Sequence, residues 1–200
     1  MVNTKLTLGD IAELRSYERE RGRFRAAVIA LRKRRRVTVG PSVALVFENR
    51  DTVRFQVQEM ARAERIVTDE GIQRELDVYN PLIPEPGQLS ATMFVELSTG
   101  EQLRRWLPRL VGIETRLLVR LGTGDVAREV RTVGDTERSA ELARPQVASS
   151  VHYVRWALDD AEVEAFAAGP VVLAVDHPDY QHETTLAAAT VAELVRDLRP

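Results

Sequence analysis

The hydrophobic pattern of the chain changes its period after Arg36, and this change constrains the fold more than any other feature. Before it, apolar side chains recur at the three- and four-residue spacing of an amphipathic helix. After it, Val37 and Val39 alternate as in a short strand, and Gly40-Pro41 is typical of a turn. The aliphatic run Val43–Phe47 then indicates a buried strand. A helix followed directly by a strand hairpin predicts a protein that mixes α and β structure.

The segment Thr52–Val67 fits both a strand and a helix at its start, because its first apolar residues alternate and also share a helical face. We predict a helix, because the second half of the segment has no strand pattern. Another helix is expected over Asp69–Val78. The first of these helices has two apolar edges, so we expect it to pack on both sides and to enclose Glu59 and Arg62 as a pair.

The proline-marked segment Pro81–Gly87 is the clearest boundary in the sequence. Beyond it, the pattern predicts two successive β-α-β units, an extra strand, a polar loop and a terminal helix. The expected strands are Leu89–Leu97, Glu114–Leu121, Val126–Val133, Ser150–Leu158 and Pro170–Val175, and the expected loop is Thr136–Ala148. The expected helices are Glu101–Leu110, a segment that begins at Asp159, and Leu186–Leu198.

These elements predict an α+β fold. Residues 1–86 form an N-terminal helical portion with a short β element. This portion packs on a ferredoxin-like (split β-α-β) C-terminal half, which spans residues 87–200. A chain of this length forms either two such parts or one compact domain.

Composition excludes several kinds of function. The chain has no cysteine, which excludes disulfides, thiolate nucleophiles, cysteine-ligated zinc and cysteine-held iron–sulfur clusters. The 28 basic and 30 acidic residues nearly balance, and the basic tract Arg32–Arg36 has no interleaved aromatic residue, so we do not expect nucleic-acid binding. No apolar run is long enough to cross a bilayer, so we predict a soluble, cytoplasmic protein with no membrane partner.

A set of acidic and polar residues around the predicted helix Thr52–Val67 is the first candidate site. Two carboxylates held close together can split their pKa values for acid–base chemistry, or can bind a metal. The same residue types also form structural ion-pair networks, which is the more frequent outcome on a packed helix. We predict that these residues line a ligand-binding cleft between the two portions of the chain: Glu48, Gln56, Glu59, Arg62 and Tyr79.

The residues after the strand Pro170–Val175 form the second candidate site. His177, Asp179 and His182 come just past the end of that strand, where functional sites tend to lie. Their side chains suit iron, manganese or zinc, although the spacing matches no standard ligand pattern. The alternative is a loop in which the aspartates accept hydrogen bonds from backbone donors. No other cofactor is predicted.

The third histidine, His152, alternates with Val154 and Trp156, so we expect it on the buried face of its strand. There it is either a hydrogen-bonded core residue or a functional one. In the ferredoxin-like topology it lies about 15–20 Å from His177 along the strands, at about 3.3 Å per residue. The two histidines are therefore not expected to share a metal.

Several longer motifs of the chain match a known family. Among them are Val39-Gly40-Pro41, Phe47-Glu48-Asn49, Gln56-Val57-Gln58-Glu59-Met60, Tyr79-Asn80-Pro81-Leu82-Ile83-Pro84 and Val175-Asp176-His177-Pro178-Asp179-Tyr180. Over nearly its whole length the chain resembles a bacterial family of unknown function, domain of unknown function three-five-zero-one. The resemblance supplies no activity, fold or catalytic residue. It implies a genomic place beside rubrerythrin-like and iron–sulfur redox proteins, and hence a role in oxidative-stress or electron-transfer physiology.

The sequence favours an accessory or binding protein that holds a partner or small ligand between the two portions and works beside a redox or stress-response system. The alternative is a metal-assisted or acid–base enzyme that uses Asp176, His177, Tyr180 and His182, or the Glu48/Glu59 pair. The sequence contains no nucleophile elbow, no phosphate-binding loop and no Glu-x-x-His pair, so no motif identifies a reaction. The sequence leaves open whether the protein is an enzyme and whether it forms a homo-oligomer.

Overall fold

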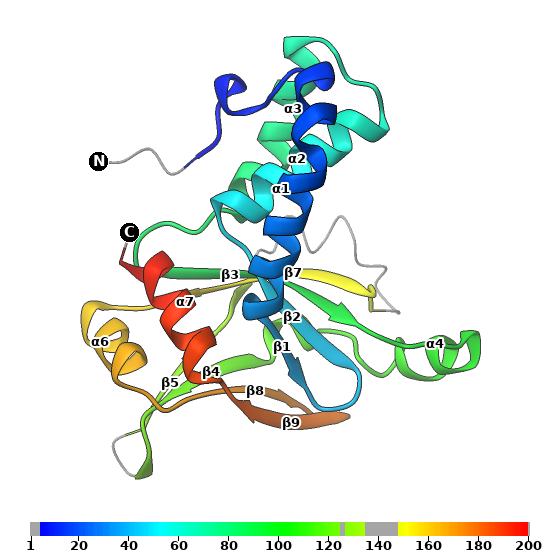
Figure 1. Ribbon diagram of the computed structural model, residues 1–200. Helices are drawn as coiled ribbons and strands as arrows, with labels where there is room; N and C mark the ends of the chain where they lie inside the picture. The colour runs from blue at the N-terminus through cyan, green and yellow to red at the C-terminus, as the bar shows by residue number, and fades with distance from the viewer. Residues whose placement is uncertain (1–4, 125–126, 135–147, 200) are drawn as a thin grey trace.

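The structure, a computed structural model, describes residues 5–124, 127–134 and 148–199. Figure 1 shows helices α1, α2 and α3 gathered on one side of the molecule and two β-sheets on the other. Among these residues, no helix is long and apolar enough to cross a membrane. The loop predicted over residues 136–148 falls almost entirely outside the described residues.

The helical layer consists of α1 (Leu14–Arg35), α2 (Arg50–Ala63) and α3 (Asp69–Tyr79), and the last two confirm the helices predicted in this part of the chain. Asn49 caps α2, because its side chain accepts hydrogen bonds from the backbone N–H groups of two residues in the first turn. The layer has a small apolar core of its own, formed by Leu6, Val53, Val57, Leu76, Leu82 and Ile83.

Sheet A has five strands in the order β1-β2-β3-β7-β6, and every neighbouring pair is antiparallel. Its strands are β1 (Arg36–Val39), β2 (Val43–Phe47), β3 (Gln88–Val95), β6 (Val133–Gly134) and β7 (Val151–Ala157). The predicted hairpin is confirmed, and its turn contains Gly40 at a φ of 66°. A Cβ atom at Gly40 would lie 2.5 Å from the His182 ring, so only glycine fits there. Because β2 pairs with β3, a boundary at residue 86 separates neighbouring strands of one sheet.

Sheet B has four antiparallel strands in the order β5-β4-β8-β9. They are β4 (Leu117–Leu121), β5 (Arg128–Arg131), β8 (Val171–His177) and β9 (Tyr180–Thr185). The remaining elements are α4 (Gly100–Trp106), α6 (Asp160–Ala168), α7 (Ala188–Leu198) and the short 3-10 helices η1 (Leu8–Asp10), η2 (Asn80–Leu82) and η3 (Ile113–Thr115). Figure 1 shows α6 and α7 side by side at one end of the sheets.

The α+β class is confirmed, but the ferredoxin-like arrangement of the C-terminal half is wrong. That arrangement requires the four strands β3, β4, β7 and β8 in one antiparallel sheet, in the order β8-β3-β7-β4. Instead β3 pairs with β7 in sheet A, β4 pairs with β8 in sheet B, and both pairs are antiparallel. The edges of β3 and β7 that β8 and β4 would need are already taken. β2 pairs with β3 where β8 would lie, and β6 pairs with β7 where β4 would lie, so β4 and β8 pair with each other in another sheet.

The main hydrophobic core lies between the two sheets and is closed at one end by α6 and α7. Phe47 and Trp156 meet in it from sheet A with ring centroids 5.8 Å apart, and both side chains are almost fully buried. Sheet A therefore has one face on this core and its other face toward the helical layer. That second face positions the candidate site.

Candidate functional site

A cavity of about 240 Å³ lies between the helical layer and sheet A, and we call it the interlayer cleft. The helical layer contributes Arg32, Val53, Gln56, Tyr79 and Leu82 to its wall. The side of sheet A contributes Val46, Glu48, Thr92, Phe94, Val151 and Tyr153. The wall thus combines residues from both sides of the predicted boundary at residue 86.

The alternation of side chains along β2, β3 and β7 explains why sheet A presents these residues to the cleft. Val46, Thr92 and Tyr153 are direct cross-strand partners, and Phe94 pairs with Val151 in the next row on the same face. The residues between them point to the opposite face and join the core between the sheets. Alternate side chains of each strand therefore face the core on one side of sheet A and the cleft on the other.

Glu48 is the most enclosed charged group in the wall of the cleft, with 7% of its surface exposed. One carboxylate oxygen accepts a hydrogen bond from the Thr92 hydroxyl at 2.7 Å, and the other accepts one from the Thr52 hydroxyl. Among the described residues, no arginine or lysine forms an ion pair with this carboxylate. Two threonine hydroxyls therefore hold a buried carboxylate without a neutralising cation.

Arg32 lies across the cleft on the last turns of α1. Its guanidinium stacks over the Phe55 ring, 5.7 Å from the centroid. The Nε atom of Arg32 is buried and has no hydrogen-bond partner in the described part of the chain. The cleft thus contains a cation and a carboxylate, and the two do not pair with each other.

The structure brings together three of the five predicted ligand-binding residues. Glu48, Gln56 and Tyr79 line the interlayer cleft, as predicted. Glu59 and Arg62 do not line it, and they do not form the predicted pair with each other.

The partners of Glu59 and Arg62 are both on α1. The Glu59 carboxylate accepts hydrogen bonds from the Tyr17 hydroxyl at 2.6 Å and from Nε and Nη2 of Arg21, both at 2.8 Å. Arg62 donates from Nε to the Glu18 carboxylate at 2.6 Å. The prediction of a pair enclosed between two halves is wrong here, because the long helix α1 covers this face of α2.

The hydrogen bonds from Arg21 are the main cause that lowers the pKa of the Glu59 carboxyl to about 2. Burial, followed by the hydrogen bond to Glu59, raises the pKa of the Tyr17 hydroxyl. Glu59 is therefore a firmly ionised member of a structural cluster. With Glu48 close to the N-terminal cap of α2, Glu59 lies about 15 Å further along the helix at 1.5 Å per residue, so the two carboxylates do not act as a pair.

The backbone N–H of Asp179 donates to Nδ1 of His177 at 3.2 Å, but the side chains of the three predicted metal ligands have different further partners. Nε2 of His177 lies 3.2 Å from the carbonyl oxygen of Val111, and Asp179 forms an ion pair with Arg109. The His182 ring packs against the Tyr180 ring, with centroids 4.5 Å apart. Across the described residues, no three His, Asp or Glu side chains lie where they could hold a metal ion. The segment is also no loop, because β8 and β9 form a hairpin through it.

The Tyr180 hydroxyl in this hairpin has a structural role. It donates a hydrogen bond to the carbonyl oxygen of Val39 at 2.7 Å and accepts hydrogen bonds from the backbone N–H groups of Ser42 and Val43. These bonds fasten β9 to the turn between β1 and β2. The Asp176 side chain is exposed, and its Oδ2 atom lies 3.5 Å from Nη2 of Arg131.

His152 is buried, as predicted, with 4% of its surface exposed. Its Nε2 lies 2.8 Å from the carbonyl oxygen of Ser149, and its Nδ1 lies 3.4 Å from the Glu114 carboxylate. Burial is the main cause that lowers the pKa of this imidazole, opposed by the charge of Glu114. His152 does not line the interlayer cleft.

Sequence reasoning missed three polar residues of the cleft: Arg32, Thr92 and Tyr153. Arg32 belongs to the basic tract Arg32–Arg36, from which we expected no nucleic-acid binding and predicted no site residue. The signal for Thr92 was its place in β3, where the residues on either side of it are apolar and buried in the core. A polar residue at that position points to a face with polar neighbours, although the sequence does not identify them.

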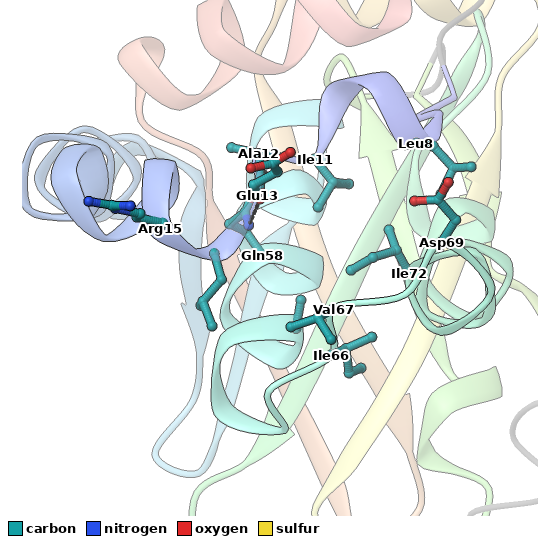
Figure 2. Close-up of a pocket in the computed structure, with 12 residues that line it drawn as sticks. Leu8, Ile11, Ala12, Glu13, Arg15, Gln58, Ile66, Val67, Asp69 and Ile72 are labelled. Atoms are coloured by element: carbon teal, nitrogen blue, oxygen red, sulfur yellow. Dashed lines mark hydrogen bonds between the residues drawn. The ribbon is translucent and has the colours of Figure 1, made fainter.

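A second hollow, of about 350 Å³, lies at the far end of the helical layer (Figure 2). Ile11, Ile66, Val67 and Ile72 supply much of its apolar wall. Its buried polar side chain is Gln58. The Gln58 amide donates from Nε2 to the carbonyl oxygen of Ala12 at 2.9 Å and accepts at Oε1 from the Ala12 N–H at 3.0 Å. This hollow therefore offers apolar surface but no buried charge, and it is the weaker candidate.

Comparisons with known proteins agree with the resemblance seen in the sequence. A family model described as "Protein of unknown function (DUF3501)" matches residues 5–198. A crystal structure described as a novel protein of unknown function from Burkholderia pseudomallei K96243 superimposes with a TM-score of 0.87 at 36% sequence identity. That match covers 97% of this chain and 99% of the other. A comparison with curated proteins finds no match.

Proposed function

The chain belongs to the DUF3501 family, and we propose that it is a binding protein that holds a small polar ligand in the interlayer cleft. One observation carries the proposal: a cavity between two layers is lined by a buried carboxylate, Glu48, and an arginine, Arg32, and neither is paired with an opposite charge among the described residues. The wall mixes apolar side chains with convergent polar groups, and such polar groups fix the orientation of a ligand in small-molecule sites.

The physical argument starts from the cost of burial. A charged side chain that is removed from water destabilises the folded protein unless an opposite charge or several hydrogen bonds compensate it. Within the described part of the chain, Glu48 has two hydroxyl donors and no cation, and the Nε atom of Arg32 has no acceptor. A ligand that supplies the missing partners would remove this cost, and that gain is a source of binding free energy.

The geometry favours binding over the enzymatic alternatives. Those alternatives need either the Glu48/Glu59 pair or a convergent set in the segment Asp176–His182, and neither set converges. A single carboxylate among hydroxyl and amide groups is sufficient for recognition. It is not by itself an acid–base pair.

Ligand-observed saturation-transfer NMR tests the proposal. The purified protein is mixed with amino acids, hydroxy acids, polyamines and sugars, and we expect transfer to at least one compound. Val151→Trp fills the interlayer cleft from β7 and is expected to abolish the signal. Val67→Trp is the matched control at the second hollow, where Val67 is 78% exposed, and it is expected to leave the signal intact.

Two outcomes would contradict the proposed site. If Val67→Trp abolishes transfer and Val151→Trp does not, the ligand binds at the end of the helical layer. If no compound shows transfer to the unmodified protein, the cleft is not a site for this range of metabolites.

We also propose that the protein works in the cytoplasm beside rubrerythrin-like or iron–sulfur redox proteins, in oxidative-stress or electron-transfer physiology. The genomic neighbourhood that the family resemblance implies is the support for this part. Affinity purification from cells that express the neighbouring genes tests it, with Val151→Trp as bait in a parallel experiment. Recovery of a redox protein by both baits supports an accessory role that does not depend on the cleft, and recovery of none contradicts it.

A further inference from the structure

The interlayer cleft presents two opposite, unpaired charges to one small cavity. Glu48 is more than nine-tenths buried, and Arg32 enters the same cavity from α1. From this arrangement we propose that the ligand is a small amino acid with an apolar side chain, whose ammonium group binds Glu48 and whose carboxylate binds Arg32. The inference rests on the proposed function and names its ligand class.

Glu48 retains the capacity to accept a hydrogen bond from an ammonium group. An ionised carboxylate offers about four acceptor positions on its two oxygens. The hydroxyls of Thr52 and Thr92 occupy one position on each oxygen. An ammonium group has three donors, so one of them can reach a remaining position and supply the cation that the described residues do not.

Arg32 suits the carboxylate of the ligand. The guanidinium presents five N–H donors in a planar fork that matches a carboxylate. The Phe55 ring contacts the guanidinium, and Arg32 also forms part of the wall of the cleft. Among the described residues, no acceptor satisfies the buried Nε atom, and no carboxylate pairs with this guanidinium.

The rest of the wall limits the size and polarity of the ligand. Val46, Val53, Leu82, Phe94 and Val151 supply an apolar surface that suits an aliphatic or aromatic side chain. The volume of about 240 Å³ is below the roughly 300–1,000 Å³ typical of sites for drug-sized ligands. Nucleotides and larger cofactors are therefore too big, whereas a single amino acid is of suitable size.

Isothermal titration calorimetry on the full-length protein tests this pairing of charges. The probes are L-leucine and L-phenylalanine, each with the matching amine that lacks the carboxylate and the matching acid that lacks the ammonium group. We expect at least one amino acid to bind about ten- to a hundredfold more tightly than either of its analogues, since hydrogen bonds to charged groups have about that effect.

Two variants assign each half of the ligand to its residue. Glu48→Gln is expected to remove the preference for the amino acid over the acid, and Arg32→Gln is expected to remove its preference over the amine. Glu64→Gln and Arg62→Gln, at positions outside the cleft, are the matched controls and are expected to leave both preferences unchanged. The comparison of the three compounds on the unmodified protein stands even if a variant does not fold.

The results separate this inference from the function it rests on. If the acid or the amine binds as tightly as the amino acid, the charge assignment is wrong. If no amino acid binds but another metabolite shows transfer that Val151→Trp abolishes, the ligand class is wrong and the cleft is still the site. If Val151→Trp affects no bound compound at all, both the ligand class and the proposed site are wrong.

Discussion

Arg32 and Arg35 lie one helical turn apart near the end of α1, and their surroundings are opposite. Arg35 is fully buried, and its guanidinium donates to the carbonyl oxygens of Phe47 and Glu48 at 2.8 and 3.1 Å and pairs with Glu193 and Asp197 of α7. Arg32 lines the cleft with a buried Nε atom that has no partner. The satisfied charge of Arg35 is structural, whereas Arg32 lines a cavity and has no ion-pair partner among the described residues.

The same contrast holds between two carboxylates, Glu59 on α2 and Glu48 at the end of β2. Glu59 accepts three hydrogen bonds from α1 and is matched by the charge of Arg21. Glu48 accepts two hydrogen bonds from hydroxyl groups and has no cationic partner among the described residues. Arg35 also binds the backbone of Glu48, so the structural arginine fixes the strand end that carries the site carboxylate.

The largest effect is expected for Arg35→Met. Removing this guanidinium leaves the Asp197 carboxylate buried without its cation and frees the carbonyl oxygens at the end of β2. Breaking a buried ion pair from one side typically costs about 3–5 kcal/mol of stability. Urea unfolding measures the change, with Lys33→Met at an exposed position of the same helix as control. A loss below about 1 kcal/mol would show that the contacts of Arg35 are not what fixes α1 to α7.

Much of the local structure, but not the pairing of the strands, follows from the sequence. The run Val43–Phe47 and the two helices after it are specified by short-range pattern, and the structure confirms them. The division into two sheets is decided by the contact between β2 and β3, whose residues lie more than 40 positions apart. No local pattern encodes which edge of a strand is already occupied.

The residues of the interlayer cleft were likewise only partly predictable from local sequence patterns. Glu48, Gln56 and Tyr79 were found because polar residues interrupt apolar segments, which is a local signal. The partners of Glu59 and Arg62 depend on which face α1 covers, and that is a tertiary contact. Arg32 and Arg35 belong to one basic tract, and only their contacts with β2, α2 and α7 distinguish them.

A smaller and pH-dependent effect is expected for Glu59→Gln. The folded pKa of about 2 lies below the ordinary glutamate pKa of 4.5, so Glu59 contributes stability that is complete above pH 4.5 and is lost as the pH falls toward 2. At pH 7 we expect the variant to lose about 1–2 kcal/mol, less than the shift alone implies because the side chain is partly exposed. Unfolding curves between pH 2 and 7 should show the two proteins converging in acid. A difference that does not change with pH would mean that packing, and not charge, is responsible.

The smallest effect on stability is expected for Arg32→Met. A small loss of stability here, beside a large one for Arg35→Met, tests the comparison between the two arginines. Because Arg32 has no ion-pair partner in the described part of the chain, removing its charge leaves no carboxylate behind without a cation. The methionine stem keeps apolar contact with the Phe55 ring, so we expect a change within about 1 kcal/mol, in either direction. Urea unfolding beside Arg35→Met measures it. A loss as large as that of Arg35→Met would show that Arg32 is also a structural arginine, and the distinction between the satisfied and the unsatisfied charge would no longer identify the cleft as a site.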